Sequence, residues 1–386
     1  MTRQLRLPYG RQTIDQQDLN AVNNVMESDW LTQGPNVFEF EEKLAHYCGA
    51  QFAVVVSNGT AALHLANLAL KADAGSKVIT TPISFVATCN SVLYAGSTPM
   101  FCDIIPETLN INPVAVRKCL RSNPDVVGII PVHMGGLIAD MEALSEIAKA
   151  NDMWVIEDAC HALGGSWLDS KGVEHRVGDC SFSDMTVFSF HPVKHITTGE
   201  GGAITTNDES LYKQLLELRS HGITKDPEKV RENHGGWYYE MHNLGYNYRI
   251  TDIQAAMGIS QLTNSDIWAK RRLKLVAQYD QAFETLPQVV PQDHPDNQTP
   301  CYHLYIVRVT NRKALYNHLR EENIYTQVHY IPIHLQPYYQ DTFGTKLGDY
   351  PEAERYYLEA LSLPLFPSMT DEDQYDVIRT VREFYA

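Results

Sequence analysis

Short apolar runs alternate with longer amphipathic stretches over the first two-thirds of the chain. The runs "FAVVVS", "KVITT", "VVGIIPV" and "MWVIEDA" have the length and the Val/Ile content of buried strands. Segments such as "GTAALHLANLAL" and "DMEALSEIAKAN" lie between them and carry apolar residues at helical spacing. Strands separated by helices are typical of βα units, so we predict an α/β fold built on a mostly parallel sheet.

The pattern changes past about residue 260. The elements predicted there are a long amphipathic helix at 267–286, a strand at 302–309, a helix at 312–324, a strand at 326–331 and two closing helices. This order predicts a smaller α+β domain over residues 259–386. Residues 1–258 are then an N-terminal arm and the large domain.

Composition narrows the class of protein. The chain has 386 residues, of which 44% are hydrophobic, enough for a packed core. Its formal net charge is −16, so we expect no nucleic-acid surface, which would need clustered Lys and Arg. No apolar run approaches the roughly 20 residues that a membrane span needs, and the first residues lack the apolar core of a signal peptide. We therefore expect a soluble cytoplasmic protein without membrane contact.

Motif searches exclude several enzyme classes. The seven cysteines are scattered singly, which predicts neither a disulfide framework nor a zinc site, and we expect no metal. The dinucleotide turn GxGxxG, the P-loop, the HExxH motif and the GxSxG elbow are absent. These absences argue against a nicotinamide dehydrogenase, a P-loop kinase and a zincin.

Polar residues follow several of the predicted strands. Ligands gather at the carboxyl ends of parallel strands, so these positions are candidates for a binding site. They are Ser57–Gly59–Thr60, Thr81–Pro82, His133 and Asp158.

Two charged residues lie in mostly apolar surroundings. Lys194 lies within "FSFHPVKHITTGEGGAIT", where a desolvated amine could form a Schiff base with an aldehyde; alternatively, its side chain extends to solvent. Asp158 ends the run "MWVIED", where a carboxylate could hold the protonated ring nitrogen of pyridoxal 5′-phosphate (PLP). The alternative for Asp158 is a helix cap or a structural ion pair.

Three further features are compatible with PLP. The segment "SNGTAAL" predicts a strand, a tight turn and a helix start, which is either a phosphate site or an ordinary N-cap. Phe85 follows a predicted strand and either stacks on a flat ring or packs in the core. His161 lies three residues beyond Asp158 and either touches the ring or is a hydrogen-bonded core histidine.

Together, five segments resemble the DegT/StrS family of PLP-dependent nucleotide-sugar aminotransferases. They are "SNGTAALH", "EDACHALGG", "FSFHPVKHITTGEGGAITTND", "LRSHGI" and "GYNYRITDIQAAMGISQL". The resemblance covers nearly the whole chain. It implies the fold of type I aspartate aminotransferases and a homodimer with active sites at the subunit interface.

A narrower resemblance is to the transaminases of pseudaminic acid biosynthesis, carried by "LTQGP", "TTPISFVATCNS", "FSFHPVKHITT", "YHLYIV" and "QVHYIPIH". It implies that L-glutamate aminates a UDP-4-keto-6-deoxy-N-acetylhexosamine to UDP-4-amino-4,6-dideoxy-N-acetyl-β-L-altrosamine. Ile331 stands where this branch carries a lysine, and the loop over residues 224–245 is longer than in some relatives. Both departures bear on the sugar rather than on the cofactor.

The resemblance also implies roles for the residues that match the family's motifs. Lys194 matches the catalytic Schiff-base lysine, Asp158 the partner of the ring nitrogen, His161 the residue at the ring's oxygen edge and Phe85 the stacking aromatic. Positions around the cofactor phosphate are Gly59, Thr60, Ser189 and Asn247, the last reaching over from the neighbouring subunit. Positions that line the sugar-nucleotide pocket are Tyr9, Asp29, Trp30, Leu31, Thr32, Gly59, Ser189, Asn247, His329, Tyr330, Ile331, Pro332 and Ile333.

Three alternatives differ in function. The same scaffold serves aminotransferases for other 3- or 4-keto nucleotide sugars, because fold alone does not determine the substrate. It also serves sugar dehydratases, but those carry a histidine in place of the lysine, and Lys194 argues against them. A regulatory protein that binds PLP without catalysis is the third alternative, and the complete set of Lys, Asp and phosphate-site residues argues against it.

Overall fold

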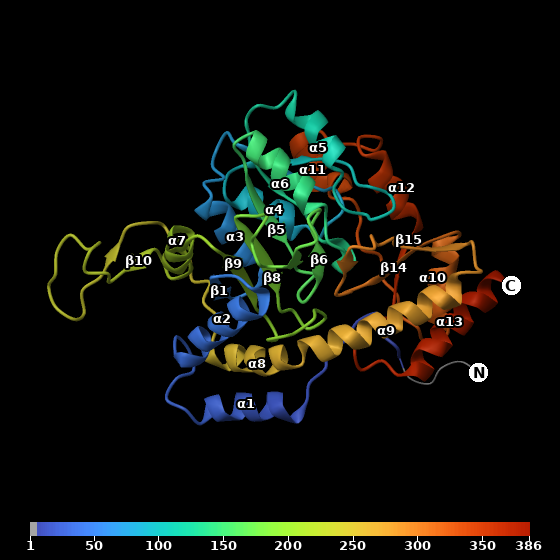
Figure 1. The fold of residues 1–386 in the computed structure, drawn as a ribbon, viewed down its shortest axis with the longest axis horizontal. Helices are drawn as coiled ribbons and strands as arrows, with labels where there is room; N and C mark the ends of the chain where they lie inside the picture. The colour runs from blue at the N-terminus through green and yellow to red at the C-terminus, as the bar shows by residue number, and fades with distance from the viewer. Residues whose placement is uncertain (1–5) are drawn as a thin grey trace.

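A seven-stranded sheet forms the centre of the computed structural model, which describes residues 6–386 (Figure 1). Across the sheet the strands are β1 (Phe52–Val56), β9 (Gly202–Thr206), β8 (Met185–Ser189), β5 (Trp154–Asp158), β4 (Val126–Ile130), β2 (Lys77–Thr80) and β3 (Thr98–Phe101). Strand β9 is antiparallel to both of its neighbours, and the remaining adjacent pairs are parallel. The predicted mostly parallel sheet is therefore confirmed.

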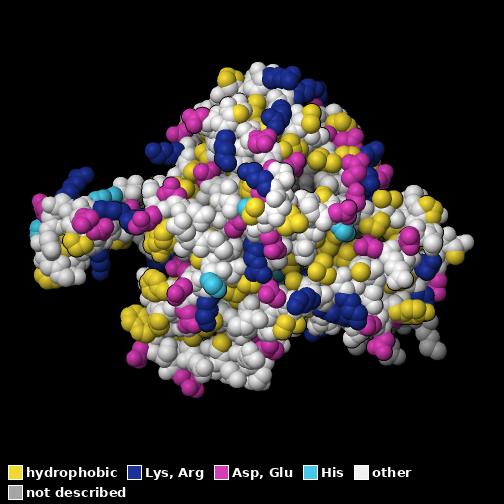
Figure 2. Space-filling model, viewed as in Figure 1, with side chains coloured by type: hydrophobic (Ala, Val, Ile, Leu, Met, Phe, Trp, Pro, Cys, Tyr) yellow, Lys and Arg dark blue, Asp and Glu magenta, His cyan; other side chains and the backbone are white. Residues whose placement is uncertain are grey.

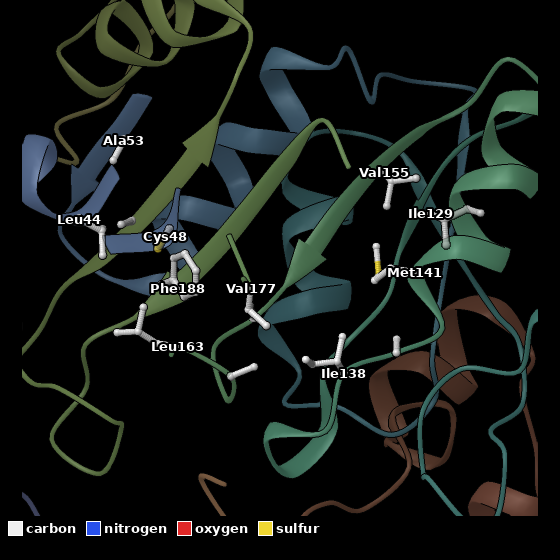
Figure 3. Packing of buried hydrophobic residues seen from close by; sticks show 14 of the residues in the cluster. Leu44, Cys48, Ala53, Ile129, Ile138, Met141, Val155, Leu163, Val177 and Phe188 are labelled. Carbon is white, nitrogen blue, oxygen red and sulfur yellow. The ribbon is translucent and has the colours of Figure 1, made fainter. Parts of the chain in front are cut away.

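Helices cover both faces of this sheet. One face is covered by α3 (Gly59–Ala69), α4 (Ala87–Tyr94) and α7 (Glu209–Arg219). The other face is covered by α2 (Pro35–Cys48), α5 (Pro113–Leu120), α6 (Met141–Ala150) and α8 (Asp252–Thr263). On this second face, Leu44 and Cys48 of α2 lie beside Phe188 of β8 in a continuous apolar core (Figure 3). Because both faces are buried, the strands are apolar throughout rather than alternating.

The C-terminal part is built on a smaller antiparallel sheet. Its strands are β12 (Val289–Pro291), β14 (Tyr305–Val309) and β15 (Ala360–Leu363). The helices of this part are α9 (Ser265–Phe283), α10 (Arg312–Glu321), α11 (Pro337–Phe343), α12 (Pro351–Glu359) and α13 (Asp371–Tyr385). The N-terminal arm joins the same core, because Leu7 is buried there and pairs with Ile324.

The remaining elements decorate the large sheet. They are α1 (Gln16–Met26), which packs against α8, the sheet of β6 (Ser166–Leu168), β7 (Glu174–Arg176) and β13 (Gln298–Thr299), the pair β10 (Ile223–Thr224) and β11 (Glu240–Met241), and the 3₁₀ turns η1 (Met134–Gly136) and η2 (Ile333–Leu335). The predicted loop over 224–245 joins β10 to β11 and projects from the body at the left of Figure 1.

One prediction for the C-terminal part needs correction, and another is untested. Residues 326–331 do not form a strand: a single bridge joins Gln327 to Ser362, and the rest of the segment is irregular. Strand β15, which supplies that bridge, was not predicted. The proposed boundary between residues 258 and 259 falls inside helix α8, and the division into two domains stays a prediction.

Three features of the described residues bear on membranes, metals and disulfides. Within residues 6–386, no helix combines the length and apolarity needed to cross a bilayer. The same residues contain no cluster of three or more metal-ligating side chains. All seven cysteines are free thiols. A cytoplasmic location stays a prediction.

Candidate active site

A cavity of about 910 Å³ lies where β5 and β8 end and α3 begins. Segments far apart in the sequence meet in its wall, from the N-terminal arm to the irregular segment around His329. The predicted residues that line it are Tyr9, Gly59, Thr60, Phe85, Asp158, His161, Ser189, Lys194, His329, Tyr330 and Ile331. The structure thus brings together every residue predicted to contact the cofactor from its own chain.

Asp158 presents a buried carboxylate at the carboxyl end of β5. Its side chain is 5% exposed, and no Lys, Arg or His side chain among residues 6–386 forms an ion pair with it. Oδ2 accepts a hydrogen bond from Thr88 Oγ1 at 2.7 Å, and Oδ1 accepts one from the Cys160 backbone N–H at 3.2 Å. Burial of a carboxylate without a cationic partner is costly, so this site suits a ligand with a protonated ring nitrogen.

Lys194 approaches the same cavity from the turn after β8. Its backbone N–H donates to the His191 carbonyl at 2.9 Å, which fixes the turn, and its side chain is partly buried in the cavity wall. Burial lowers the pKa of the amine below its ordinary value, although the nearby Cys160 and Asp158 oppose the shift. A lowered pKa favours the neutral amine, the form that attacks an aldehyde or accepts a proton.

The N-terminus of α3 forms a cradle for an anion. The Asn58 side chain caps the helix by accepting the Ala61 N–H at 2.8 Å, and the N–H groups of the first turn have no acceptor within the helix. Ser189 closes the other side so tightly that a Cβ at Gly59 would lie 2.9 Å from Ser189 Cβ. A phosphate group fits this cradle, because both the free N–H groups and the helix dipole attract negative charge.

Aromatic side chains form the remaining wall. His161 Nδ1 accepts the Gly135 N–H at 3.4 Å, so its protonated Nε2 faces the Tyr330 hydroxyl at 3.2 Å. Burial, with help from the Lys194 charge, lowers the pKa of His161 well below its usual range and keeps the ring neutral. Phe85 is 57% exposed, and its ring centroid lies 6.1 Å from that of Tyr330. Core packing therefore does not account for Phe85, whose ring face is free to stack on a flat ligand.

Several predicted substrate residues lie outside this cavity. Pro332 is buried outside it, and Ile333 is fully buried against Tyr339; their substrate contacts stay predictions. Exposed surface residues are Asp29, Trp30, Leu31, Thr32 and Asn247. Thr32 bridges to Thr251 at the start of α8, so residues 29–32 lie at the surface near the segment that holds Asn247.

Other cavity residues were not predicted. Thr88 and Ser84 follow β2 within the segment "SFVAT", and their hydroxyl groups gave no signal in the sequence, because Thr and Ser occur in any helix start. His303 lines the cavity and is 4% exposed, with its ring centroid 4.5 Å from that of His161. The sequence placed His303 inside the strand predicted for residues 302–309, whereas the structure starts β14 only at Tyr305 and leaves His303 before the strand.

The site combines four features at the carboxyl ends of strands in the large sheet: an amine, a buried carboxylate, an anion cradle and a free aromatic face. This combination is typical of enzymes that use PLP. The chain belongs to the DegT/DnrJ/EryC1/StrS aminotransferase family, whose sequence model matches residues 12–382. Membership confirms that the protein is an aminotransferase, and the relatives below identify it as a sugar aminotransferase.

Among curated proteins, the spore coat polysaccharide biosynthesis protein SpsC of Bacillus subtilis is 39% identical over 384 residues, covering 98% of this chain and 96% of SpsC. Among solved structures, Helicobacter pylori PseC, an aminotransferase involved in the biosynthesis of pseudoaminic acid, matches with a TM-score of 0.89 and 31% identity, covering 98% of this chain and 99% of PseC. The PLP form of the putative sugar aminotransferase Spr1654 from Streptococcus pneumoniae also has a TM-score of 0.89, with 28% identity and 98% of each chain covered. The predicted fold and the predicted cofactor, PLP, are confirmed.

Proposed function

We propose that this sugar aminotransferase transfers the amino group of L-glutamate to the keto carbon of a UDP-4-keto-6-deoxy-N-acetylhexosamine, as in pseudaminic acid biosynthesis. The observation that carries the proposal is the similarity to PseC along 98% of the chain, at 31% identity and a TM-score of 0.89. The segment 329–331, which matches the sugar pocket of that branch, lines the cavity together with Tyr9. The ring centroid of Tyr9 lies 5.1 Å from that of His329.

PLP, when bound, supplies an aldehyde for the amino group and a ring that withdraws electrons. The Lys194 amine would hold the cofactor through its aldehyde. In its neutral form the same amine would accept the proton from the α-carbon of glutamate, and it would later deliver a proton to the sugar carbon that receives the amino group. Asp158 keeps the ring nitrogen protonated. The first turn of α3 and Ser189 hold the phosphate, and Phe85 packs on the ring face.

The cavity has too little positive charge for a nucleotide diphosphate. The charged side chains in its wall are Asp158, Lys194 and Glu200. Lys194 is committed to the reaction, so the two phosphates of the substrate need cations from elsewhere. Arg249 and Arg11 are candidates, and both lie outside the cavity wall of their own chain. A second copy of the chain would supply Arg249 together with Asn247.

This requirement supports the proposal of a homodimer with shared active sites. Near residues 29–32, the exposed apolar side chains on and between α1 and α2 include Leu19, Met26, Trp30 and Phe38. In Figure 2, hydrophobic side chains gather at the lower left, where Figure 1 places the start of α2. Apolar surface of this kind is characteristic of protein interfaces. Complementation tests the shared site: Lys194→Ala and Asn247→Ala variants, each inactive alone, should regain about a quarter of the wild-type activity when subunits are exchanged, because one site in each mixed dimer is intact. Activity that stays at the level of the unmixed variants would contradict a shared site.

A different keto sugar is the second candidate. SpsC, named for spore coat polysaccharide biosynthesis, is more similar in sequence at 39% identity, and Ile331 replaces the lysine expected for the pseudaminic branch. The test is incubation of the enzyme with glutamate and a panel of UDP- and dTDP-linked 3- and 4-keto sugars, with the products analysed by NMR. Amination at C4 of the UDP-N-acetyl sugar alone supports the first candidate, and preferred amination of a dTDP sugar supports the second. A cofactor absorbance that glutamate does not change would favour a non-catalytic binder.

A further inference from the structure

Two buried hydroxyl groups lie behind the carboxylate of Asp158. Thr88 is 0% exposed and its Oγ1 lies 2.7 Å from Asp158 Oδ2. Ser84 is 2% exposed and its Oγ lies 2.6 Å from Thr88 Oγ1. Both residues belong to the turn that follows β2 and starts α4, and both contribute to the cavity wall.

The direction of these hydrogen bonds follows from the chemistry of the groups. An ionised carboxylate only accepts, so Thr88 donates its single hydroxyl proton to Asp158. The oxygen of Thr88 is then left to accept, and Ser84 must be the donor in the second contact. Thr88 Oγ1 also lies 3.3 Å from the Phe85 carbonyl, a longer contact that cannot compete for the same proton. The hydroxyl chain therefore runs from Ser84 through Thr88 to Asp158.

This chain has two effects on Asp158. A hydrogen bond to an ionised group is among the stronger ones in proteins, so Thr88 holds Asp158 Oδ2 firmly in place. It also adds a second fixed contact to the one from Cys160 to Oδ1, so both oxygens are held and the plane of the carboxylate cannot rotate freely. The same turn carries Phe85, which links the orientation of the carboxylate to the aromatic wall of the cavity.

We propose that Thr88, supported by Ser84, is a positioning residue that keeps the carboxylate of Asp158 aimed at the ring nitrogen of the cofactor. The inference rests on the proposed role of Asp158. If the inference is right, the Thr88 hydroxyl strengthens cofactor binding only through the contact between Asp158 and the ring nitrogen. A cofactor without that nitrogen should therefore bind equally well with or without the hydroxyl.

The test compares binding of PLP and of 1-deaza-PLP, which has a carbon in place of the ring nitrogen, to the full-length apoprotein by absorbance titration. Thr88→Val removes the hydroxyl at nearly constant volume, and it should weaken PLP binding by about tenfold or more while changing the affinity for 1-deaza-PLP by less than about twofold. Thr88→Ser keeps the hydroxyl and should restore PLP affinity to within about threefold of the wild type. Ser84→Ala should show a smaller loss, again confined to PLP.

Equal losses for both cofactors in Thr88→Val, or a Thr88→Ser variant as weak as Thr88→Val, would overturn the inference, because a structural defect acts on both cofactors alike. Should Thr88→Val fail to fold, the selective loss in Ser84→Ala decides in its place. Asp158→Asn separates the two levels of the argument. If Asp158→Asn keeps the wild-type ratio of affinities for PLP and 1-deaza-PLP, the proposed role of Asp158 itself is wrong. If Asp158→Asn loses this preference for PLP while the Thr88 variants keep it, only the inference about Thr88 fails.

Discussion

Adding one methyl group at Gly59, in the phosphate cradle, should weaken the binding of PLP. In Gly59→Ala, the new Cβ would lie 2.9 Å from Ser189 Cβ, 3.3 Å from Ser189 Oγ and 3.5 Å from Cys160 Sγ. Carbon atoms in contact prefer about 3.5 Å or more, so the first pair must separate by about 0.6 Å. Ser189 ends β8, which is paired on both sides within the large sheet, and the shift therefore falls on the start of α3.

The size of the effect follows from this displacement. Overpacking of this kind costs about 1–3 kcal/mol. The helix N-terminus itself accepts alanine, so no other cost is expected at this position. Because the displaced N–H groups are those that hold the phosphate, we expect the dissociation constant for PLP to rise by a factor of about 5 to 150, with little change in the secondary structure of the apoprotein.

A double-mutant cycle with Ser189→Gly isolates the clash. Removing the Ser189 side chain removes the two nearest atoms and leaves the ordinary contact with Cys160 Sγ. On that background, Gly59→Ala should cost less than about threefold in PLP affinity, measured by titration of the apoprotein. A penalty of the same size on both backgrounds would refute the cradle geometry, and no penalty on either would show that phosphate does not bind at this helix N-terminus.

Two further predictions concern charge. Asp158→Asn, studied at PLP concentrations that offset its weaker binding, should slow the half-reaction with glutamate, followed by absorbance, by about 10²-fold or more, because the neutral amide cannot keep the ring nitrogen protonated; an unchanged rate would remove Asp158 from the mechanism. Burial lowers the pKa of His195 from 6.5 to about 3, with Arg272 as a further cause. Between these pH values His195 binds a proton in the unfolded chain but not in the folded chain. The free energy of unfolding therefore falls as the pH drops from about 6.5 toward 3, and this group contributes a loss of about 2 kcal/mol at pH 5. His195→Gln keeps a donor for the Cys301 carbonyl, which His195 Nε2 contacts at 2.8 Å, but it cannot titrate. Urea unfolding of the apoprotein at pH 7 and pH 5 should show a loss smaller by about that amount in the variant, and an equal loss in both proteins would contradict the assignment.

Local signals predicted much of the large domain and part of the site. The strand, turn and helix at residues 52–69 and the carboxylate at the end of β5 follow from patterns within a few residues, and the structure shows both. His133 was equally well placed by the same rule, yet it is fully buried and turned toward Glu157, with 2.8 Å between Nε2 and Oε2. Successive side chains along an extended segment point to opposite sides, so one faces the cavity and the next faces the core. A shift of one residue therefore reverses which side a given side chain faces.

Long-range packing decided what local patterns could not. Tyr9 and the segment around His329 reach the cavity because Leu7 in the N-terminal arm pairs with Ile324 in the C-terminal part, more than 300 residues away. Only the family resemblance pointed to these residues. The alternating "TQVHYI" was wrongly predicted as a strand, because pairing needs a neighbour along its whole length and the structure provides one bridge. Thr88 was missed because a threonine in a helix start carries no sign of the carboxylate it contacts.

The account depends most directly on the covalent bond between the cofactor and Lys194. The holoenzyme should be reduced with borohydride, digested and analysed by mass spectrometry, with Lys194→Ala as the control. The account predicts a phosphopyridoxyl group on the peptide that contains Lys194, lost when glutamate is added before reduction and absent from the variant. A phosphopyridoxyl group on another lysine, or none on this peptide in a protein that retains the cofactor's absorbance, would contradict it.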